Sequence, residues 1–167
     1  MLSLFRRKTK IVYVQKVVSG DDNEFWDSAE EIETEPWEQD TKTTPLRCLS
    51  GCGLTEIPSD IFELKFLVIL HIDNNQIKEL PHEIKNLKAL RDINLLGNQI
   101  TKFDNLCSLV NLEIVILADN EIEAIPKGVV RLKKLKTLNL TGNHITKLGS
   151  SKLQKFLGKI ANFSYKD

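Results

Sequence analysis

An eleven-residue pattern recurs along the chain and limits the folds that this sequence can adopt. It reads LRDINLLGNQI at residues 90–100, and the same skeleton returns at 67–77, 112–122 and 135–145. The asparagines of the four copies stand 23, 22 and 23 residues apart, at Asn75, Asn98, Asn120 and Asn143. A fixed period of this size predicts a stack of similar units, each of which buries its apolar face against its neighbours.

Within each copy, apolar residues alternate with other residues, as in a short strand. Side chains two positions apart on a strand point to the same side. One set should therefore line the interior: Leu70, Ile72, Ile93, Leu95, Val115, Leu117, Leu138 and Leu140. The backbone must then turn inside the stack, away from water. An asparagine amide both donates and accepts hydrogen bonds, so we predict that the asparagine column satisfies the buried backbone groups of these turns.

The second half of each unit is predicted to return the chain over the convex side. The next inward positions are Ile57, Leu80, Phe103, Ile125 and Leu148, followed in three units by Pro58, Pro81 and Pro126. Apolar pairs then follow: Ile61 with Leu64, Ile84 with Leu87, and Val129 with Leu132. The unit from Asn98 to Asn120 lacks the proline and is one residue shorter. Its Cys107 is expected to pack as a small apolar side chain.

The skeleton L-x-x-(L/I/V)-x-(L/I)-x-x-N-x-I resembles the leucine-rich repeat. The likeness covers residues 45–148, with Cys52 at a position where this family accepts cysteine for asparagine, and with Arg47 departing from the apolar consensus. The resemblance implies an α/β fold, a right-handed leucine-rich-repeat solenoid of about five 22–23-residue repeats with a parallel concave sheet. It also implies a non-catalytic protein-binding scaffold or signalling adaptor. The proline-containing repeats look like those of Ras-suppressor-type proteins, and the shorter one resembles repeats of a type 1 phosphatase regulatory subunit.

The period stops after Leu148, and residues 149–167 are predicted to form a helical C-terminal cap. Ser150 or Ser151 is available as the N-cap. Apolar residues then follow at helical spacing: Leu153, Phe156, Leu157, Ile160 and Phe163.

Residues 1–44 precede the repeats and divide into a basic and an acidic part. The run KIVYVQKVV at residues 10–18 has the composition of a short strand, which could cover the N-terminal end of the stack. Alternatively, Lys10–Tyr13 is similar to a short motif that binds type 1 protein phosphatase, although Tyr13 departs from its Phe or Trp. Residues 20–44 are acidic and predicted to form a flexible linker. Its Trp26 and Trp37 either anchor a partner or pack on the chain's own basic C-terminal part.

The net charge is zero, but it is sorted into blocks. Residues 1–19 hold five basic residues and no acid, residues 20–40 hold ten acids and no base, and residues 127–167 hold ten basic residues and one acid. This pattern favours contacts with oppositely charged surfaces over general nucleic-acid binding. No run approaches the roughly 20 apolar residues of a membrane span, and no signal peptide is recognised. We expect a cytoplasmic monomer with its three cysteines reduced.

Motifs for catalysis are absent from the sequence. It has no glycine-rich phosphate-binding loop, no H-E-x-x-H and no paired C-x-x-C, so we expect no enzyme, no small-molecule substrate, no cofactor and no metal. Cys48 and His71 are predicted to share one outward column, about 5 Å apart on adjacent strands. A nucleophile also needs an orienting group, an oxyanion site and a pocket, so we attribute this pair to coincidence.

The residues left over after removal of the core are the candidates for function. Outward positions on the strands place Ile69, Leu96, Ile114, Ile116 and Ala118 together, and contiguous exposed apolar surface marks interaction sites. The predicted partner-binding residues on the concave face are Ile69, His71, Asp73, Asp92, Asn94, Leu96, Ile114, Ile116, Ala118 and Asn139. The alternative is that residues 11–18 or the tryptophan segment cover this surface. The predicted function is an intracellular adaptor that binds a folded protein, with a phosphatase-targeting subunit as the second hypothesis.

Overall fold

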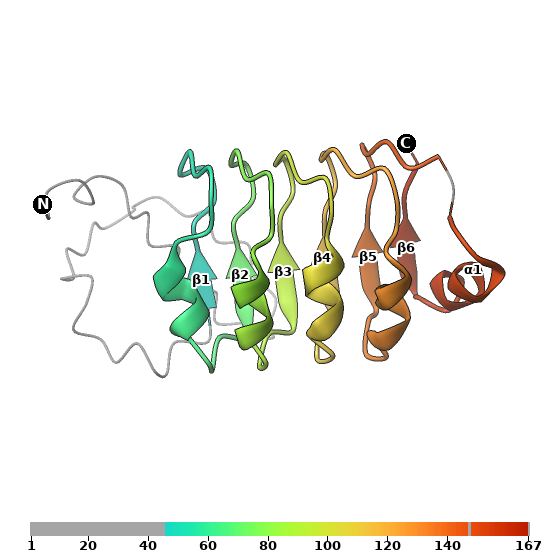
Figure 1. Ribbon diagram of the computed structural model, residues 1–167, viewed down its shortest axis with the longest axis horizontal. Helices are drawn as coiled ribbons and strands as arrows, with labels where there is room; N and C mark the ends of the chain where they lie inside the picture. The colour runs from blue at the N-terminus through green and yellow to red at the C-terminus, as the bar shows by residue number, and fades with distance from the viewer. Residues whose placement is uncertain (1–45, 147, 167) are drawn as a thin grey trace, which may run out of the picture.

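Short parallel strands form one sheet in chain order (Figure 1). The computed structural model describes residues 46–146 and 148–166. Its strands are β1 (Leu46–Cys48), β2 (Ile69–His71), β3 (Asp92–Asn94), β4 (Ile114–Ile116), β5 (Thr137–Asn139) and β6 (Asn162–Ser164). The predicted solenoid with a parallel sheet is confirmed. The predictions for Lys10–Tyr13, the strand at 10–18, the acidic linker, Trp26 and Trp37 lie outside the described residues.

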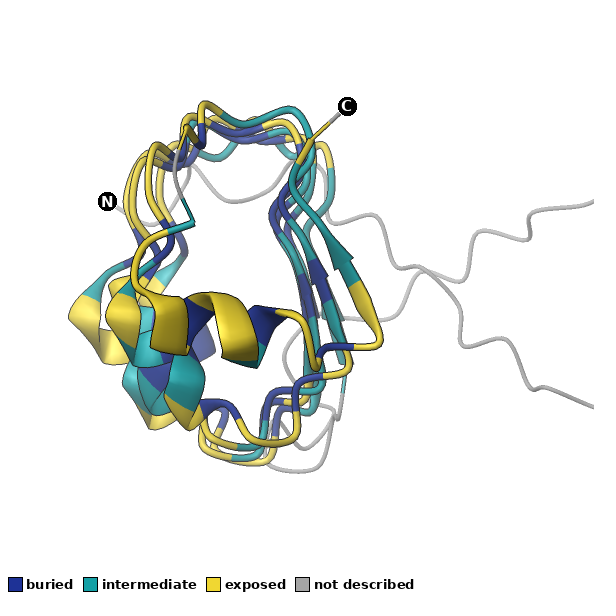
Figure 2. Ribbon diagram, turned by 90° about the vertical axis from the view of Figure 1, so that its right-hand side faces the viewer, coloured by how far each residue is buried: buried dark blue, intermediate teal, exposed yellow. Residues whose placement is uncertain are grey.

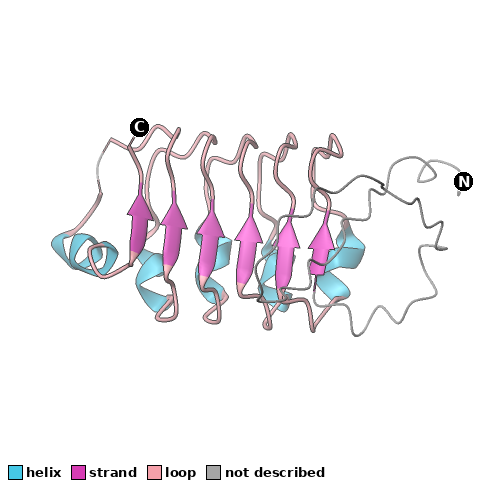
Figure 3. Ribbon diagram, turned by 180° about the vertical axis from the view of Figure 1, so that it is seen from behind, coloured by secondary structure: helices cyan, strands magenta, loops and turns pink. Residues whose placement is uncertain are grey.

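A 3-10 helix follows each of the strands β1 to β4 on the opposite side of the stack. Figure 3 shows the strands as a row with the helices behind them, and Figure 2 shows the two layers along the axis of the stack. The helices are η1 (Ser59–Glu63), η2 (His82–Asn86), η3 (Asp104–Ser108) and η4 (Lys127–Arg131). Pro58, Pro81 and Pro126 stand directly before η1, η2 and η4. A proline is tolerated at a helix start because the N–H it lacks would have no partner inside the helix.

The core lies between these two layers and contains the predicted side chains. The eight side chains that the alternation predicts to point inward, from Leu70 to Leu140, are each at most 1% exposed. Ile57, Leu80, Phe103 and Ile125 are buried on the return path, and Leu148 is half-buried against the same cluster. The sequence periodicity therefore identified the core correctly. Arg47 occupies the inward register beside Leu70, but it is half-buried, as expected in an end repeat.

The asparagine column joins each unit to the one before it. Asn98 Oδ1 accepts a hydrogen bond of 3.0 Å from the backbone N–H of Ile77. Its Nδ2 donates to the carbonyls of Ile72 at 3.0 Å, Leu95 at 3.0 Å and Leu96 at 3.3 Å. Asn75, Asn120 and Asn143 repeat this arrangement. The predicted donor and acceptor roles are confirmed, and they link neighbouring units directly.

The residue directly before Cys52, and before each asparagine of the column, has a left-handed backbone. Its φ is 64° at Gly51, 55° at Asn74, 64° at Gly97, 53° at Asp119 and 65° at Gly142. Glycine adopts this conformation without strain, and asparagine and aspartate tolerate it better than other residues. A Cβ at Gly97 would lie 2.9 Å from Asn74 Oδ1, and one at Gly142 would lie 2.0 Å from Asp119 Oδ1. Glycine is favoured at both positions because a larger residue would have to displace the side chain of the preceding unit.

The shorter unit accommodates its missing residue on the helical side. Phe103, which is 1% exposed, takes the place that proline holds before the other 3-10 helices. Asn105 Nδ2 donates a hydrogen bond of 2.7 Å to the carbonyl of Leu80 in the preceding unit. The strands on either side keep the same register, with Ile93 beside Val115. The deletion therefore leaves the sheet undisturbed.

The C-terminal segment contains the predicted helix and a strand that was not predicted. Helix α1 (Ser151–Leu157) begins after Ser150, whose Oγ accepts from the N–H of Leu153. The expectation that Ile160 and Phe163 belong to this helix is wrong, because the helix ends at Leu157 and Phe163 lies on β6. The alternation of Phe163 and Tyr165 matches the strand period. Backbone hydrogen bonds join the new strand to β5: the N–H of Asn162 donates to the carbonyl of Lys136, and the N–H of Leu140 donates to the carbonyl of Ser164.

Replacement of Asn120 by alanine should destabilise the fold more than the same change at Asn143. Asn120 is 5% exposed, so its loss leaves the N–H of Ile100 without a partner, at about 1–3 kcal/mol. Asn143 makes equivalent hydrogen bonds but is half-buried, so water can replace its amide. Urea unfolding of the two variants and the wild type measures both costs. Equal losses would contradict the argument that burial, rather than the bonds alone, sets the cost.

Candidate functional site

The outward side chains of the strands and of the residues just after them form one continuous surface, here called the outer sheet face. All of the predicted partner-binding residues lie on it, and nine of the ten are half-buried: Ile69, His71, Asp73, Asp92, Asn94, Leu96, Ile114, Ile116 and Asn139. Backbone pairing holds these side chains in columns at the strand spacing of about 4.8 Å. The surface is therefore fixed by the sheet.

The apolar part of this face is smaller than the sequence indicated. In the register of β2, β3 and β4, Asp92 stands between Ile69 and Ile114, so Ile69 is separated from the other apolar side chains. Ile114 and Ile116 lie on the same side of β4, and Leu96 follows β3 beside them. We call Leu96, Ile114 and Ile116 the central apolar patch.

Ala118 does not contribute an exposed side chain to this patch. It is 4% exposed, contrary to the expectation that its side chain belongs to an exposed apolar surface. The backbone hydrogen bonds from Gly97 to Ala118 and from Asp119 to Thr141 place Ala118 between Leu96 and Thr141. A methyl group between two larger side chains is covered by them. Ala118 therefore lies beneath the surface that Leu96 and Thr141 form.

A carboxylate organises the polar region on the β1 and β2 side of the patch. Asp73 Oδ1 accepts hydrogen bonds from Ser50 Oγ at 2.6 Å and from Asn94 Nδ2 at 3.1 Å. Its Oδ2 accepts from Asn74 Nδ2 at 2.8 Å. Asn94 Oδ1 in turn accepts from the N–H of Leu96 at 3.1 Å. These bonds span three units and hold the side chains in fixed positions.

His71 and Asp92 form a second polar pair on this face. His71 Nε2 lies 3.9 Å from Asp92 Oδ1. Partial burial raises the pKa of the Asp92 carboxyl, and the nearby imidazole opposes that rise. The register places Cys48 beside His71 as predicted, and Cys48 Sγ lies 3.3 Å from Ser50 Oγ.

On the opposite side of the patch, β5 and β6 present neutral polar groups. Asn139 Oδ1 accepts from Thr141 N–H at 3.0 Å, Thr141 Oγ1 at 2.9 Å and Ser164 Oγ at 3.0 Å. Asn162 Nδ2 donates to Thr137 Oγ1 at 3.2 Å. Asn162 and Ser164 were missed by the sequence analysis because β6 was missed. The alternation around Phe163 and Tyr165 was the signal that could have revealed them.

A charged ladder borders the face where the strands begin, and sequence reasoning did not single it out. Glu113 accepts hydrogen bonds from Lys136 Nζ at 2.5 Å and from Arg91 Nη1 at 3.2 Å. The hydrogen bond and charge of Lys136, followed by the charge of Arg91, lower the pKa of Glu113. The patch is thus flanked by groups of both charges.

Cys107 lies on η3, away from the outer sheet face. It is 4% exposed, which confirms the predicted packing role. Burial raises the pKa of its thiol to about 12, and the charge of Asp104 acts in the same direction against the weaker effect of Arg131. A thiol in this state is a poor nucleophile.

Two kinds of feature are absent from the described residues. Across residues 46–146 and 148–166, no cluster of three or more His, Cys, Asp or Glu side chains could hold a metal ion. No helix in the same part of the chain is long and apolar enough to span a membrane. The arrangement on the outer sheet face can contribute apolar contact and hydrogen bonds from fixed positions.

Comparisons with known sequences agree with the repeat pattern. A family described as "Leucine-rich repeat region" matches residues 41–159. Leucine-rich repeat-containing protein 7 of Rattus norvegicus is 31% identical over 86 residues, which cover 43% of this chain and 6% of that protein. An uncharacterised leucine-rich repeat-containing protein of Schizosaccharomyces pombe is 37% identical over 76 residues, or 44% of this chain and 12% of the relative. The chain thus matches a small fraction of the length of these relatives.

Solved structures share the solenoid. A leucine-rich-repeat protein of Leptospira interrogans superimposes with a TM-score of 0.59 and 29% identity, covering 68% of this chain and 28% of that chain. Internalin C2 of Listeria monocytogenes gives a TM-score of 0.59 at 22% identity, covering 71% of this chain and 49% of that one. The second likeness shows the fold alone.

The Cys107 thiol should resist chemical labelling in the native protein. A variant with Cys48→Ser and Cys52→Ser leaves Cys107 as its single cysteine. At pH 8 a water-soluble thiol reagent should modify this variant slowly when folded and rapidly after addition of denaturant, because burial keeps the thiol protonated and out of reach. Mass spectrometry measures the modified fraction. Equal labelling rates in the two conditions would contradict the buried position of the Cys107 side chain.

Proposed function

We propose that this chain, which belongs to the leucine-rich-repeat family, binds another protein through its outer sheet face and performs no catalysis itself. The family is typically a non-catalytic interaction fold. The observation that carries the proposal is the central apolar patch, Leu96, Ile114 and Ile116, which sits half-buried among fixed polar groups.

The composition of this face suits a specific protein interface. Stable interfaces place apolar side chains at their centre and polar groups at their rim. Here the apolar residues lie on β4 and just after β3, with Asp73 and Asn94 on one side and Asn139 on the other. Side chains on paired strands lose little freedom when a partner binds, and this lowers the entropic cost of association.

The charges on the face indicate which charges a partner should carry. Asp73 and Asp92 lie on the β2 and β3 side of the patch, while β5 and β6 offer uncharged amides and hydroxyls. A partner with a basic edge and an apolar centre would fit this distribution. We place the function in the cytoplasm, with the chain acting as a monomeric scaffold or signalling adaptor. The free thiols of Cys48, Cys52 and Cys107 support a reducing compartment.

A second candidate is a targeting subunit of a protein phosphatase. Two sequence features favour it: Lys10–Tyr13, which is similar to a phosphatase-docking motif, and the 22-residue unit between Asn98 and Asn120. In this case the outer sheet face would contact the enzyme or its substrate, while the N-terminal motif would hold the enzyme.

Replacing Ile116 by aspartate should abolish partner binding with little loss of stability. Ile116 lies between Asn94 and Asn139 in the sheet, so the two residues directly beside a carboxylate there carry no charge. The stability cost should stay within about 1 kcal/mol, the range of strand propensities. Leu95→Ala, at a fully buried position of the preceding unit, should cost roughly 2–5 kcal/mol. Thermal unfolding measures both effects.

The matched control for this experiment is Asn162→Asp, which adds the same charge on the exposed end strand of the same face. Affinity capture from the native cell should recover the partner with the wild type and with Asn162→Asp, but not with Ile116→Asp. Identical recovery by all three proteins would remove the central apolar patch from the binding site.

The phosphatase hypothesis predicts that Ile11→Ala combined with Tyr13→Ala removes a type 1 phosphatase from such a capture. The motif that Lys10–Tyr13 resembles has a basic residue, then Val or Ile, then any residue, then Phe or Trp. Ile11 and Tyr13 therefore stand at its apolar positions, whereas Val12 stands at its variable position, and Val12→Ala is the control. Immunoblotting for the phosphatase measures the loss. Capture that is equal for the three proteins, or absent from the wild type, would reject this candidate.

A further inference from the structure

Positive charge collects at the C-terminal end of the stack. Residues 127–167 contain ten lysines and arginines and one acid. Lys127 and Arg131 of η4 are exposed, as are Lys152 and Lys155 of α1, and η4 packs against α1. None of these four side chains forms an ion pair with a residue that the structure describes. Their charges are therefore available to an acidic ligand.

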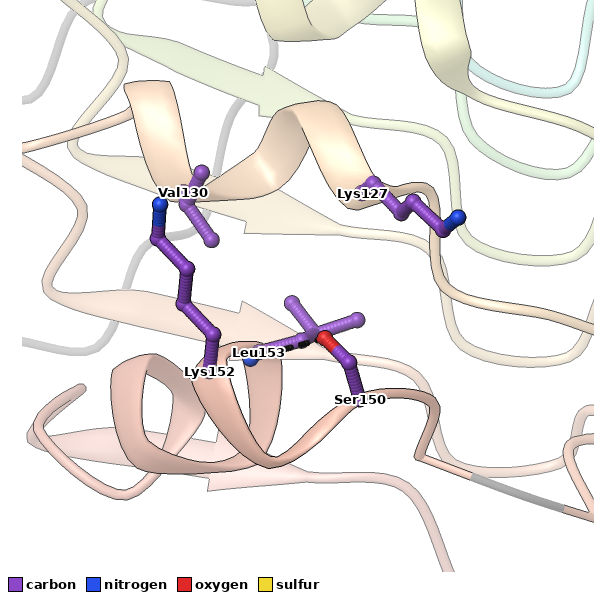
Figure 4. A pocket seen from close by; sticks show the side chains of 5 residues that line it. All are labelled: Lys127, Val130, Ser150, Lys152 and Leu153. Atoms are coloured by element: carbon purple, nitrogen blue, oxygen red, sulfur yellow. Dashed lines mark hydrogen bonds between the residues drawn. The ribbon is translucent and has the colours of Figure 1, made fainter.

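A small hollow of about 220 Å³ lies between η4 and α1 (Figure 4). Val130 and Leu153 form its apolar lining, and Ser150 stands at its edge with its hydroxyl bonded to the Leu153 N–H. In Figure 4 the ammonium groups of Lys127 and Lys152 lie on opposite sides of the two apolar side chains. Pockets for small-molecule ligands measure about 300–1,000 Å³. The hollow instead suits a single apolar side chain whose neighbours carry negative charge.

We propose that the acidic segment of this same chain, residues 20–40, docks at this hollow. The segment carries ten acids and no base, and it contains both tryptophans of the protein, Trp26 and Trp37. An acid directly follows each of them, Asp27 and Glu38. A tryptophan brings a large apolar surface between Val130 and Leu153, and the adjacent carboxylates meet the lysines on either side.

The outer sheet face is a poorer match for this segment. The outward side chains of β1 to β6 include Asp92 and no lysine or arginine, and Asp73 follows β2 directly. Like charges would repel an acidic segment from that face, while opposite charges attract it to η4 and α1. Docking at the C-terminal end therefore leaves the central apolar patch open to a partner.

The chain is long enough to make this contact. Residue 30 precedes Leu46 by 16 positions, which corresponds to a reach of about 50 Å at 3.3–3.6 Å per extended residue. The distance from β1 to β5 along the sheet is four strand spacings, or about 19 Å at 4.8 Å each. Packed layers of secondary structure lie about 10 Å apart. Residues near the middle of the segment can therefore reach the hollow from the start of β1.

Tryptophan fluorescence of the full-length protein tests this contact, because both tryptophans lie in the proposed ligand. The native emission should be shifted to shorter wavelength than that of the denatured chain and should be protected from quenching by acrylamide. Lys127→Glu combined with Lys152→Glu should move the emission and the quenching constant toward the values of the denatured chain. Trp26→Phe and Trp37→Phe then identify which ring enters the hollow.

The control is Lys65→Glu with Lys88→Glu, which changes the net charge equally at two exposed positions in the N-terminal half of the stack. It should leave emission and quenching at the wild-type values. Circular dichroism confirms that both variants fold, and Lys127→Gln with Lys152→Gln replaces the charge reversal if they do not. Native emission equal to that of the denatured chain overturns the proposal. An equal response of the emission to both charge reversals also overturns the proposal. So does an emission shift that appears only at high protein concentration, because it would indicate contact between copies of the chain.

Discussion

The structure depends on the hydrogen bonds of one asparagine amide in each of four successive repeats. Asn98 accepts from Ile77 in the preceding unit and donates to Ile72 in that unit and to Leu95 in its own. These bonds satisfy backbone groups that the turn removes from water, and they also fix the distance between successive strands. The outward side chains consequently align in columns. The central apolar patch exists as a surface because β3 and β4 are locked in this way.

The one-residue difference in length between the units falls where this constraint does not act. The unit that lacks a residue takes up the difference around Phe103 and η3, where Asn105 ties it to Leu80, and its asparagine bonds are unchanged. The turn before the asparagine column is less tolerant. A left-handed backbone and the nearby side chain of Asp119 favour glycine at position 142.

The two layers of the solenoid differ in charge and so can serve different purposes. The sheet layer carries apolar and neutral polar groups with acids toward β2 and β3. The helical layer ends in exposed lysines around Val130 and Leu153. A ligand attracted to one layer leaves the other free. Docking of the acidic segment at the C-terminal end, as proposed, would thus leave the outer sheet face free within this small domain.

The sequence by itself determined the repeating interior, because inward positions such as Ile93 and the amide of Asn98 depend on a local period that each unit carries. Most of the outer sheet face followed from the same alternation. Only the tertiary structure decided that Ala118 is covered by its neighbours and that β6 completes the sheet. Exposure and strand pairing are set by side chains and backbone groups from other units, which no single repeat contains.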